Sequence, residues 1–161
     1  MIKPAVCVAA AVVLAGCGRS SDRPLPQISG LTPIPTLLEL ESSGIEERSR
    51  RIVARPGQWD TVWTEITRNG RVSGPRPEID FRREMLALAT SEVGTPANLY
   101  MRFEGYRFRA DTMEVYLLLN VGTEDCPLPD LVANPFLIGR LPRWDKPIEF
   151  HERQTERCGS S

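Results

Sequence analysis

The stretch "NLYMRFEGYRFRADTMEVYLLLNVG", residues 98–122, decides the expected fold. Its first half, 98–109, alternates weakly between apolar and polar residues. Its second half, 113–122, is rich in Val, Tyr and Leu, which favour β-strands. The short segment 110–112 separates the two halves, so the stretch predicts a β-hairpin.

Further strands are expected on both sides of this hairpin. They are short apolar or β-prone segments bounded by Gly, Pro or Ser. The predicted strands lie within residues 36–44, 48–57, 85–90, 136–143 and 146–153. The loop 123–135 contains three prolines and is expected to be irregular.

One amphipathic helix is predicted over "PGQWDTVWTEITRNG", residues 56–70. Apolar side chains recur at helical spacing on one face, and Asn69-Gly70 supplies a C-terminal stop. We expect this face to pack on a sheet, in a core that includes Trp59, Trp63, Phe81 and Phe136. A membrane surface is the alternative, but the polar face has acids and no base before Arg68.

These elements predict an α+β domain that is mainly antiparallel, with six or seven strands in a sandwich- or barrel-like arrangement and one helix on the sheet. The strands follow one another without intervening helices. Parallel pairs are therefore not expected.

The N-terminus has the three parts of a secretory signal: Lys3, an apolar run over 5–14, and Leu14-Ala15-Gly16-Cys17. The apolar run is about half as long as a helix needs to be to span a bilayer. The final tetrapeptide resembles the lipobox of bacterial lipoproteins. The resemblance implies that residues 1–16 are a signal peptide and that the Cys17 thiol carries a lipid.

The same resemblance implies a location and a domain plan. Residues 17–35, with four prolines, form a tether, and 36–161 form a single globular domain. The protein is expected in the bacterial cell envelope, held to the membrane by its lipid. Gly18 and Arg19 follow the cysteine where an Asp would signal inner-membrane retention, so the outer membrane is expected if the host has one.

Two cysteines, Cys126 and Cys158, remain after the signal and the lipidated thiol are subtracted. In an oxidising compartment such a pair predicts a disulfide. A metal site is the weaker alternative, because neither cysteine has a Cys or His nearby at ligand spacing.

Charge and motifs exclude several classes of function. The formal net charge is −1, and the arginines are interspersed with acids, so a nucleic-acid partner is not expected. No catalytic motif, metal site or cofactor motif is found. The only histidine, His151, is expected to be an exposed residue at the end of the last strand.

The order of features resembles the family named for the C-terminal domain of PrcB, a lipoprotein subunit of a bacterial surface protease complex. The resemblance covers about residues 45–151. It is carried by Trp59 and Trp63, by Asp80-Phe81, and by Pro135, Phe136, Ile138 and Pro142. The family's Pro-Thr-Gly-Gly-Tyr-like turn is replaced by "GTPANLY", in which Ala97, Asn98 and Leu99 stand where flexible glycines would precede Tyr100.

Two classes of function remain open. The first is a non-enzymatic binding or stabilising module for another envelope or secreted protein, with a protease as one candidate. Its surface would be the loops that carry Thr95, Asn98, Tyr100, Asp130 and Asn134.

The second class is a domain that binds a small carboxylate or sugar, or an enzyme acting on one. It would use Tyr100, Tyr106, Arg107 and Arg109 in a cleft. A deep pocket in which these polar groups converge would favour this class over the first.

Overall fold

The computed structural model describes residues 27–40, 45–68, 72, 74–92, 95–96, 100–121 and 132–156. Cys17, the signal peptide, Asn98, Cys126, Asp130 and Cys158 lie outside these residues. The elements in chain order are β1 (Thr36–Leu40), β2 (Ser49–Val53), α1 (Pro56–Thr67), β3 (Glu84–Thr90), β4 (Thr95–Pro96), β5 (Tyr100–Arg109), β6 (Thr112–Val121), β7 (Val132–Ala133), β8 (Phe136–Pro142) and β9 (Ile148–Glu156).

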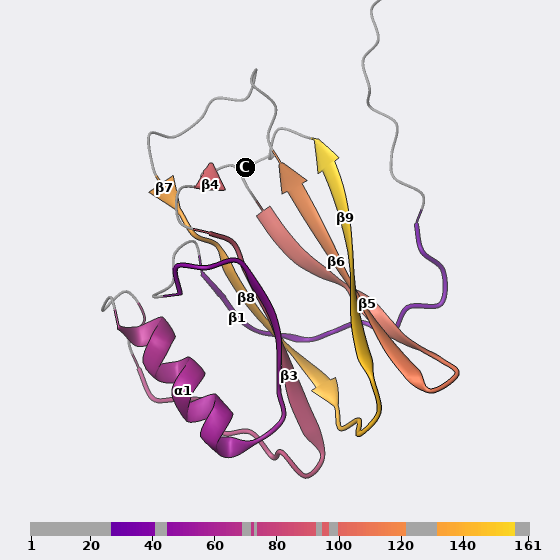
Figure 1. Ribbon diagram of the computed structural model, residues 1–161, viewed down its shortest axis with the longest axis horizontal. Helices are drawn as coiled ribbons and strands as arrows, with labels where there is room; N and C mark the ends of the chain where they lie inside the picture. The colour runs from indigo at the N-terminus through magenta and orange to yellow at the C-terminus, as the bar shows by residue number, and fades with distance from the viewer. Residues whose placement is uncertain are drawn as a thin grey trace, which may run out of the picture.

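The strands form two larger sheets and one small one (Figure 1). The first has the order β1-β8-β3-β2 and is antiparallel throughout. The second has the order β5-β6-β9, and its β5–β6 pair is the predicted hairpin. The two-residue strands β4 and β7 pair with each other, and β7 lies inside the loop 123–135 that was expected to be irregular.

The surroundings of strand β3 explain why the sequence 85–89 is apolar at every position. Met85, Ala87 and Ala89 pack with residues of the second sheet, whereas Leu86 and Leu88 pack with α1. All five side chains are buried. A strand that is covered on both faces loses the alternation that marks a strand with one wet face.

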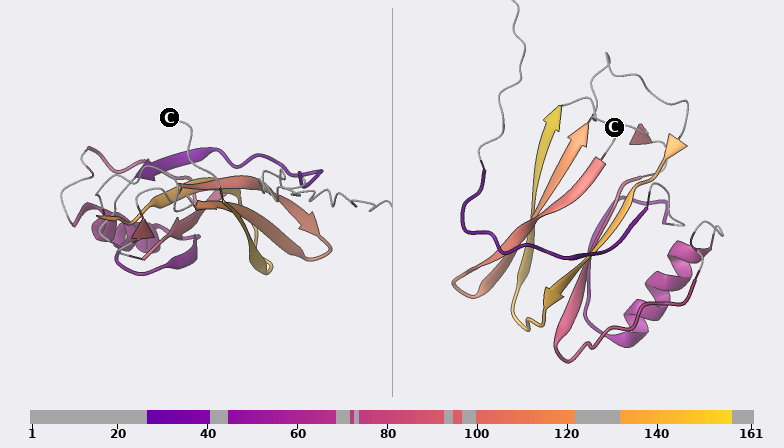
Figure 2. Two further views of the ribbon diagram at one scale, coloured as in Figure 1. Left: turned by 90° about the horizontal axis from the view of Figure 1, so that it is seen from above. Right: turned by 180° about the vertical axis from the view of Figure 1, so that it is seen from behind.

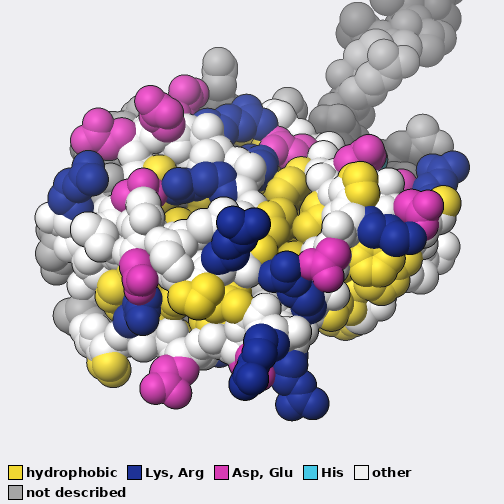
Figure 3. Space-filling view, turned by 60° about the horizontal axis from the view of Figure 1, so that its bottom comes forward, with side chains coloured by type: hydrophobic (Ala, Val, Ile, Leu, Met, Phe, Trp, Pro, Cys, Tyr) yellow, Lys and Arg dark blue, Asp and Glu magenta, His cyan; other side chains and the backbone are white. Residues whose placement is uncertain are grey.

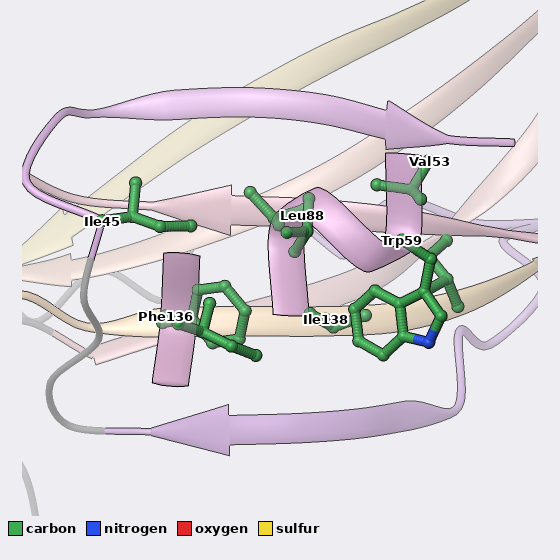
Figure 4. Close-up of a cluster of buried hydrophobic side chains, with 9 residues drawn as sticks. Ile45, Val53, Trp59, Leu88, Phe136 and Ile138 are labelled. Atoms are coloured by element: carbon green, nitrogen blue, oxygen red, sulfur yellow. The ribbon is translucent and has the colours of Figure 1, made fainter. Parts of the chain in front are cut away.

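Helix α1 covers the outer face of the first sheet. Trp59 and Phe136 are 2% and 1% exposed and lie in one cluster between helix and sheet (Figure 4). Trp63 packs edge-on against Trp59, with ring centroids 5.5 Å apart. Trp63 and Phe81 are partly buried at the border of this cluster.

The second sheet packs on the other face of the first. Met113 and Val115 of β6 share a buried cluster with Met85 of β3 and Leu141 of β8. In the described residues the two sheets do not close into a barrel, so the barrel-like alternative is wrong. The predicted α+β class, mainly antiparallel with one helix on a sheet, is confirmed.

The β6–β9 pair is parallel, which corrects the expectation that parallel pairs are missing. A parallel pair requires a long crossover, usually a helix. Here the chain makes that crossover through β8, a strand of the other sheet. The sequence predicts no helix between β6 and β9. No local pattern in it indicates that a strand of the other sheet makes the connection.

The N-terminal segment 27–35 joins the two sheets. Thr32 exchanges two backbone hydrogen bonds with Tyr106 of β5, and Pro35 accepts one from the Arg140 amide of β8. Seen from behind, the segment crosses the strands toward the α1 side (Figure 2). Gly105, with φ +145°, permits this approach, because a Cβ there would lie 2.6 Å from the Thr32 carbonyl oxygen.

Candidate binding site at the upper end of the sheets

The upper end of the domain is where β1 and β6 finish and β5 and β8 begin, at the top of Figure 1. Here β4 pairs with β7, with Thr95 opposite Ala133 and Pro96 opposite Val132. This pairing brings together two stretches of chain that were predicted from the sequence to form one binding surface. Thr95 is thus placed beside β7.

A hollow of about 350 Å³ opens next to this small sheet. Phe136 and Leu137 of the core lie beneath this hollow and are almost fully buried. Among the described residues of the lining, Glu39 is the one with a charged side chain. The described lining consists of Glu39, Leu40, Tyr100, Met101, Pro135, Phe136 and Leu137.

Tyr100 is placed at this hollow by strand alternation. It is the first residue of β5 and lies opposite Asn120 of β6. Its neighbour Met101 points into the core and is 3% exposed, so the Tyr100 ring points outward and is 49% exposed. A half-exposed tyrosine beside an apolar hollow is typical of an anchor residue in a protein interface.

Asn134 does not belong to this surface, which corrects the expectation for that residue. It is 4% exposed, and its side-chain amide donates a 2.5 Å hydrogen bond to the Ile45 carbonyl. Because a buried amide requires such a partner, Asn134 fixes the start of β8 to the segment before β2.

The residues of the alternative small-molecule cleft do not converge. Tyr100 and Arg109 stand at opposite ends of β5, about 30 Å apart at the usual rise per residue. Tyr106 packs in the core between the sheets and against Phe108. Arg107 is bound to Glu114 of β6. These four side chains therefore line no common pocket.

Glu114 is the centre of a polar cluster on the outer face of the second sheet. Its carboxylate is 7% exposed. One oxygen, Oε2, accepts hydrogen bonds of 2.6 Å from both the Tyr116 hydroxyl and Arg107 Nε. The other oxygen, Oε1, lies 3.7 Å from the Arg109 guanidinium. The charge of the buried carboxylate is thereby balanced within the fold.

This cluster shifts three pKa values. The hydrogen bonds from Tyr116 and Arg107 lower the pKa of Glu114. Burial, followed by the hydrogen bond to Glu114, raises the pKa of Tyr116. The hydrogen bond to Glu114 raises the pKa of the Arg107 guanidinium. All three shifts favour the protonation states that hold the cluster together at neutral pH.

His151 corrects a further expectation. It lies in the middle of β9 opposite Tyr116, and not at the end of the strand. Its ring stacks on the Tyr116 ring with centroids 5.1 Å apart, and its side chain is 41% exposed. The strand is longer than predicted because it continues beside β6 as far as Glu156.

Sequence reasoning missed Leu40 and Met101 in the hollow and Glu114 in the polar cluster. Glu114 was detectable, since it is the one acid in a run of apolar strand residues. A two-residue turn at 110–111 sets Arg107 opposite it across the hairpin. Leu40 and Met101 carry no comparable signal, because their position depends on how the sheets pack.

Metal and membrane sites were also sought in the described residues. No group of three or more His, Cys, Asp or Glu side chains is arranged there to hold a metal ion. None of the described helices has the length and apolar character that crossing a membrane requires.

Comparisons with known proteins found no family model, no curated protein and no solved structure that matches the chain. The resemblance to the PrcB C-terminal family and the lipobox therefore stay predictions from the sequence.

Proposed function

We propose that the chain is a lipid-anchored, non-enzymatic module of the bacterial cell envelope that binds another envelope or secreted protein at its upper end. The lipobox-like sequence at Cys17 supports the anchor. The half-exposed Tyr100 ring beside the apolar hollow carries the binding proposal.

The chemistry of the hollow favours a peptide segment as the ligand. Its described lining residues other than Glu39 have apolar or aromatic side chains, polar atoms contribute about half of its surface, and one of its residues is the half-exposed Tyr100. Small ligands are usually fixed by several convergent polar side chains, whereas a protein segment can gain its affinity from one anchored aromatic contact. An apolar side chain of the partner would fill the space between Tyr100 and Leu40.

The partner class follows from location and resemblance. An anchored module meets proteins that are secreted or attached to the same envelope. The resemblance to a subunit of a protease complex makes a protease the first partner to test, although a shared domain does not transfer a partner by itself.

A photo-crosslinking residue at position 100 tests the binding proposal in intact cells. The expected result is one discrete adduct that disappears when Leu40 is changed to Asp, because a buried charge would spoil the hollow. Arg102 is the matched control, since it lies two residues along the same strand and is exposed. Equal adducts from both positions, or none from position 100, would refute the proposal.

The anchor is tested separately with Cys17→Ala. We expect the Cys17→Ala variant to lose lipid labelling. If its uncleaved signal, residues 1–16, is also removed genetically, we expect the protein to move from the membrane fraction to the soluble fraction. Unchanged membrane retention of that variant would contradict the anchor without affecting the crosslinking result.

A further inference from the structure

An aromatic cluster lies at the lower end of the domain, opposite the proposed binding site. Phe108 of β5 is 50% exposed, and its ring lies 4.6 Å from Trp144 and 5.6 Å from Tyr106 between centroids. Trp144 is partly exposed, and the Lys146 ammonium lies over its ring at 5.8 Å. Phe108 and Tyr100 are the exposed large hydrophobic residues of the described chain.

The turns around this cluster are basic. We define the lower end as residues 54–55, 80–83, 109–111 and 143–147, which connect the strands at the bottom of Figure 1. The hydrogen bonds from Arg143 to the Arg83 and Ala54 carbonyls hold three of these turns together. The exposed charged residues there are Arg55, Arg82, Arg83, Arg109, Arg143 and Lys146 against Asp80, Asp111 and Asp145.

The space-filling view of this end shows how the charges and the apolar area combine. Dark blue Lys and Arg side chains are spread across the surface, and a yellow hydrophobic area lies on the side of the β5–β6 hairpin (Figure 3). Exposed aromatic rings surrounded by Lys and Arg are typical of surfaces that lie in the interfacial region of a membrane. The rings contact one another and Arg82, Arg109, Arg143 and Lys146 pair with acids, yet the Phe108 side chain stays half exposed.

The length of chain before the domain limits how far this end can be from the membrane. If Cys17 carries the lipid, residues 17–26 span at most about 35 Å to Gln27. Gln27 lines a hollow with Phe103 of β5, and Phe108 lies about 17 Å further along that strand. The tether is therefore long enough to let the lower end touch the bilayer, and short enough to keep the membrane close.

We propose that the lower end lies against an anionic membrane surface, with Phe108 and Trp144 in the headgroup region and the basic turns beside lipid phosphates. The inference rests on the proposed lipid anchor. It adds an orientation, because β5 then runs from the membrane at Phe108 to the partner site at Tyr100. The membrane holds the upper end outward, where a partner can reach it.

Trp144 provides the test in the full, lipidated protein. The protein is reconstituted into vesicles of phosphatidylglycerol and phosphatidylcholine, with or without bromine on the acyl chains, and tryptophan emission is compared. We expect brominated lipid to quench the emission. Trp144→Phe should remove most of that quenching, because Trp59 is buried at 2% exposure and Trp63 lies on α1.

Two variants with matched exposure give the control. Phe108→Ser should lose the quenching, whereas Tyr100→Ser, with 49% exposure at the other end, should keep it. Replacing phosphatidylglycerol by phosphatidylcholine should weaken the contact by more than fivefold, since each basic residue near an anionic surface contributes about fivefold.

The outcomes separate this inference from the anchor. Protein that floats with the vesicles but shows no quenching, or shows the same quenching after Trp144→Phe, overturns the membrane contact and leaves the anchor standing. Purified protein that does not float with the vesicles at all overturns the anchor, and the membrane contact falls with it.

Discussion

Strand β5 presents two aromatic side chains of almost equal exposure, Tyr100 at 49% and Phe108 at 50%, in opposite surroundings. Tyr100 stands beside a hollow whose lining has one charged residue, Glu39. Phe108 lies against Tyr106 and Trp144 among exposed Arg and Lys side chains. At equal exposure, the different surroundings predict different partners: an apolar protein segment at one end and a charged lipid surface at the other.

The two ends also differ in charge. Among the described residues, the lower end has six exposed bases and three exposed acids. The exposed charges near the upper end are more evenly divided, with acids at Glu39, Glu46, Glu47 and Glu92 and bases at Arg48, Arg68 and Arg102. Anionic lipid therefore attracts the lower end more strongly, which favours the proposed orientation.

The largest effect is expected from Gly105→Ala, which acts between the two ends. The new Cβ would lie 2.6 Å from the Thr32 carbonyl oxygen and 2.9 Å from Leu31 Cβ, at φ +145°. We expect the free energy of unfolding to fall by about 2 to 4 kcal/mol in urea titrations, with both the crosslink and the quenching reduced.

Gly57→Ala is the control for that variant. Gly57 lies in α1, and its added Cβ would meet nothing within 4 Å. The exchange should stabilise the protein by up to about 1 kcal/mol, because alanine favours a helix. Equal stability of the two variants would mean that segment 27–35 does not pack on β5 as described.

A second prediction separates the ends directly. Tyr100→Ser should weaken partner binding by about 30-fold, which corresponds to the loss of about 2 kcal/mol typical of an interface anchor, and should leave the membrane contact intact. Phe108→Ser should do the reverse. Partner affinity is measured by titration with the crosslinked protein once it is identified. If either variant weakens both contacts while keeping its unfolding midpoint, the two ends are not independent.

A third prediction uses the pH dependence of the cluster around Glu114, which lies nearer to the lower end. Its pKa is lowered in the folded protein, so its stabilising contribution is present above the ordinary value of 4.5 and is lost as the pH falls below it. The raised pKa of Tyr116 has the opposite sign: its contribution is present below pH 10 and is lost as the pH rises further.

Glu114→Gln is the variant for this measurement. Urea midpoints of the original protein and of Glu114→Gln should differ at pH 7 and converge below pH 4.5, because protonation removes the same charge as the substitution. A difference that stays constant from pH 7 to pH 3 would argue that the carboxylate charge contributes nothing.

The smallest effect is expected from Lys146→Gln. Lys146 pairs with Asp111, and both side chains are exposed, so the loss of this pair should change the free energy of unfolding by less than about 1 kcal/mol. The same change should weaken the contact with anionic vesicles about fivefold. Loss of stability without a change in vesicle contact would reverse the role assigned to this residue.

Local patterns were sufficient for most of the fold. The hairpin from 100 to 121 follows from β-prone residues around a short turn, and α1 follows from apolar residues at helical spacing. The apolar run 85–90 was correctly predicted to be a buried strand. These elements depend on neighbours in the chain, which a sequence displays directly.

Features that depend on distant residues were not predictable. The parallel pairing of β9 with β6 arises because β8 joins the other sheet. Asn134 was expected on the surface but is buried against Ile45, a partner 89 positions away in the chain. The membrane-facing role proposed for Phe108 requires Trp144, which comes from a different turn.

By itself, the sequence determined the class of the domain, its helix and its hairpin, because each depends on residues adjacent in the chain, and for the same reason it predicts the lipobox-like address at Cys17. Only the tertiary structure decided that Tyr100 and Phe108 stand at opposite ends with different surroundings. The hollow and the basic turns are each built from segments far apart in sequence, and packing alone brings such segments together.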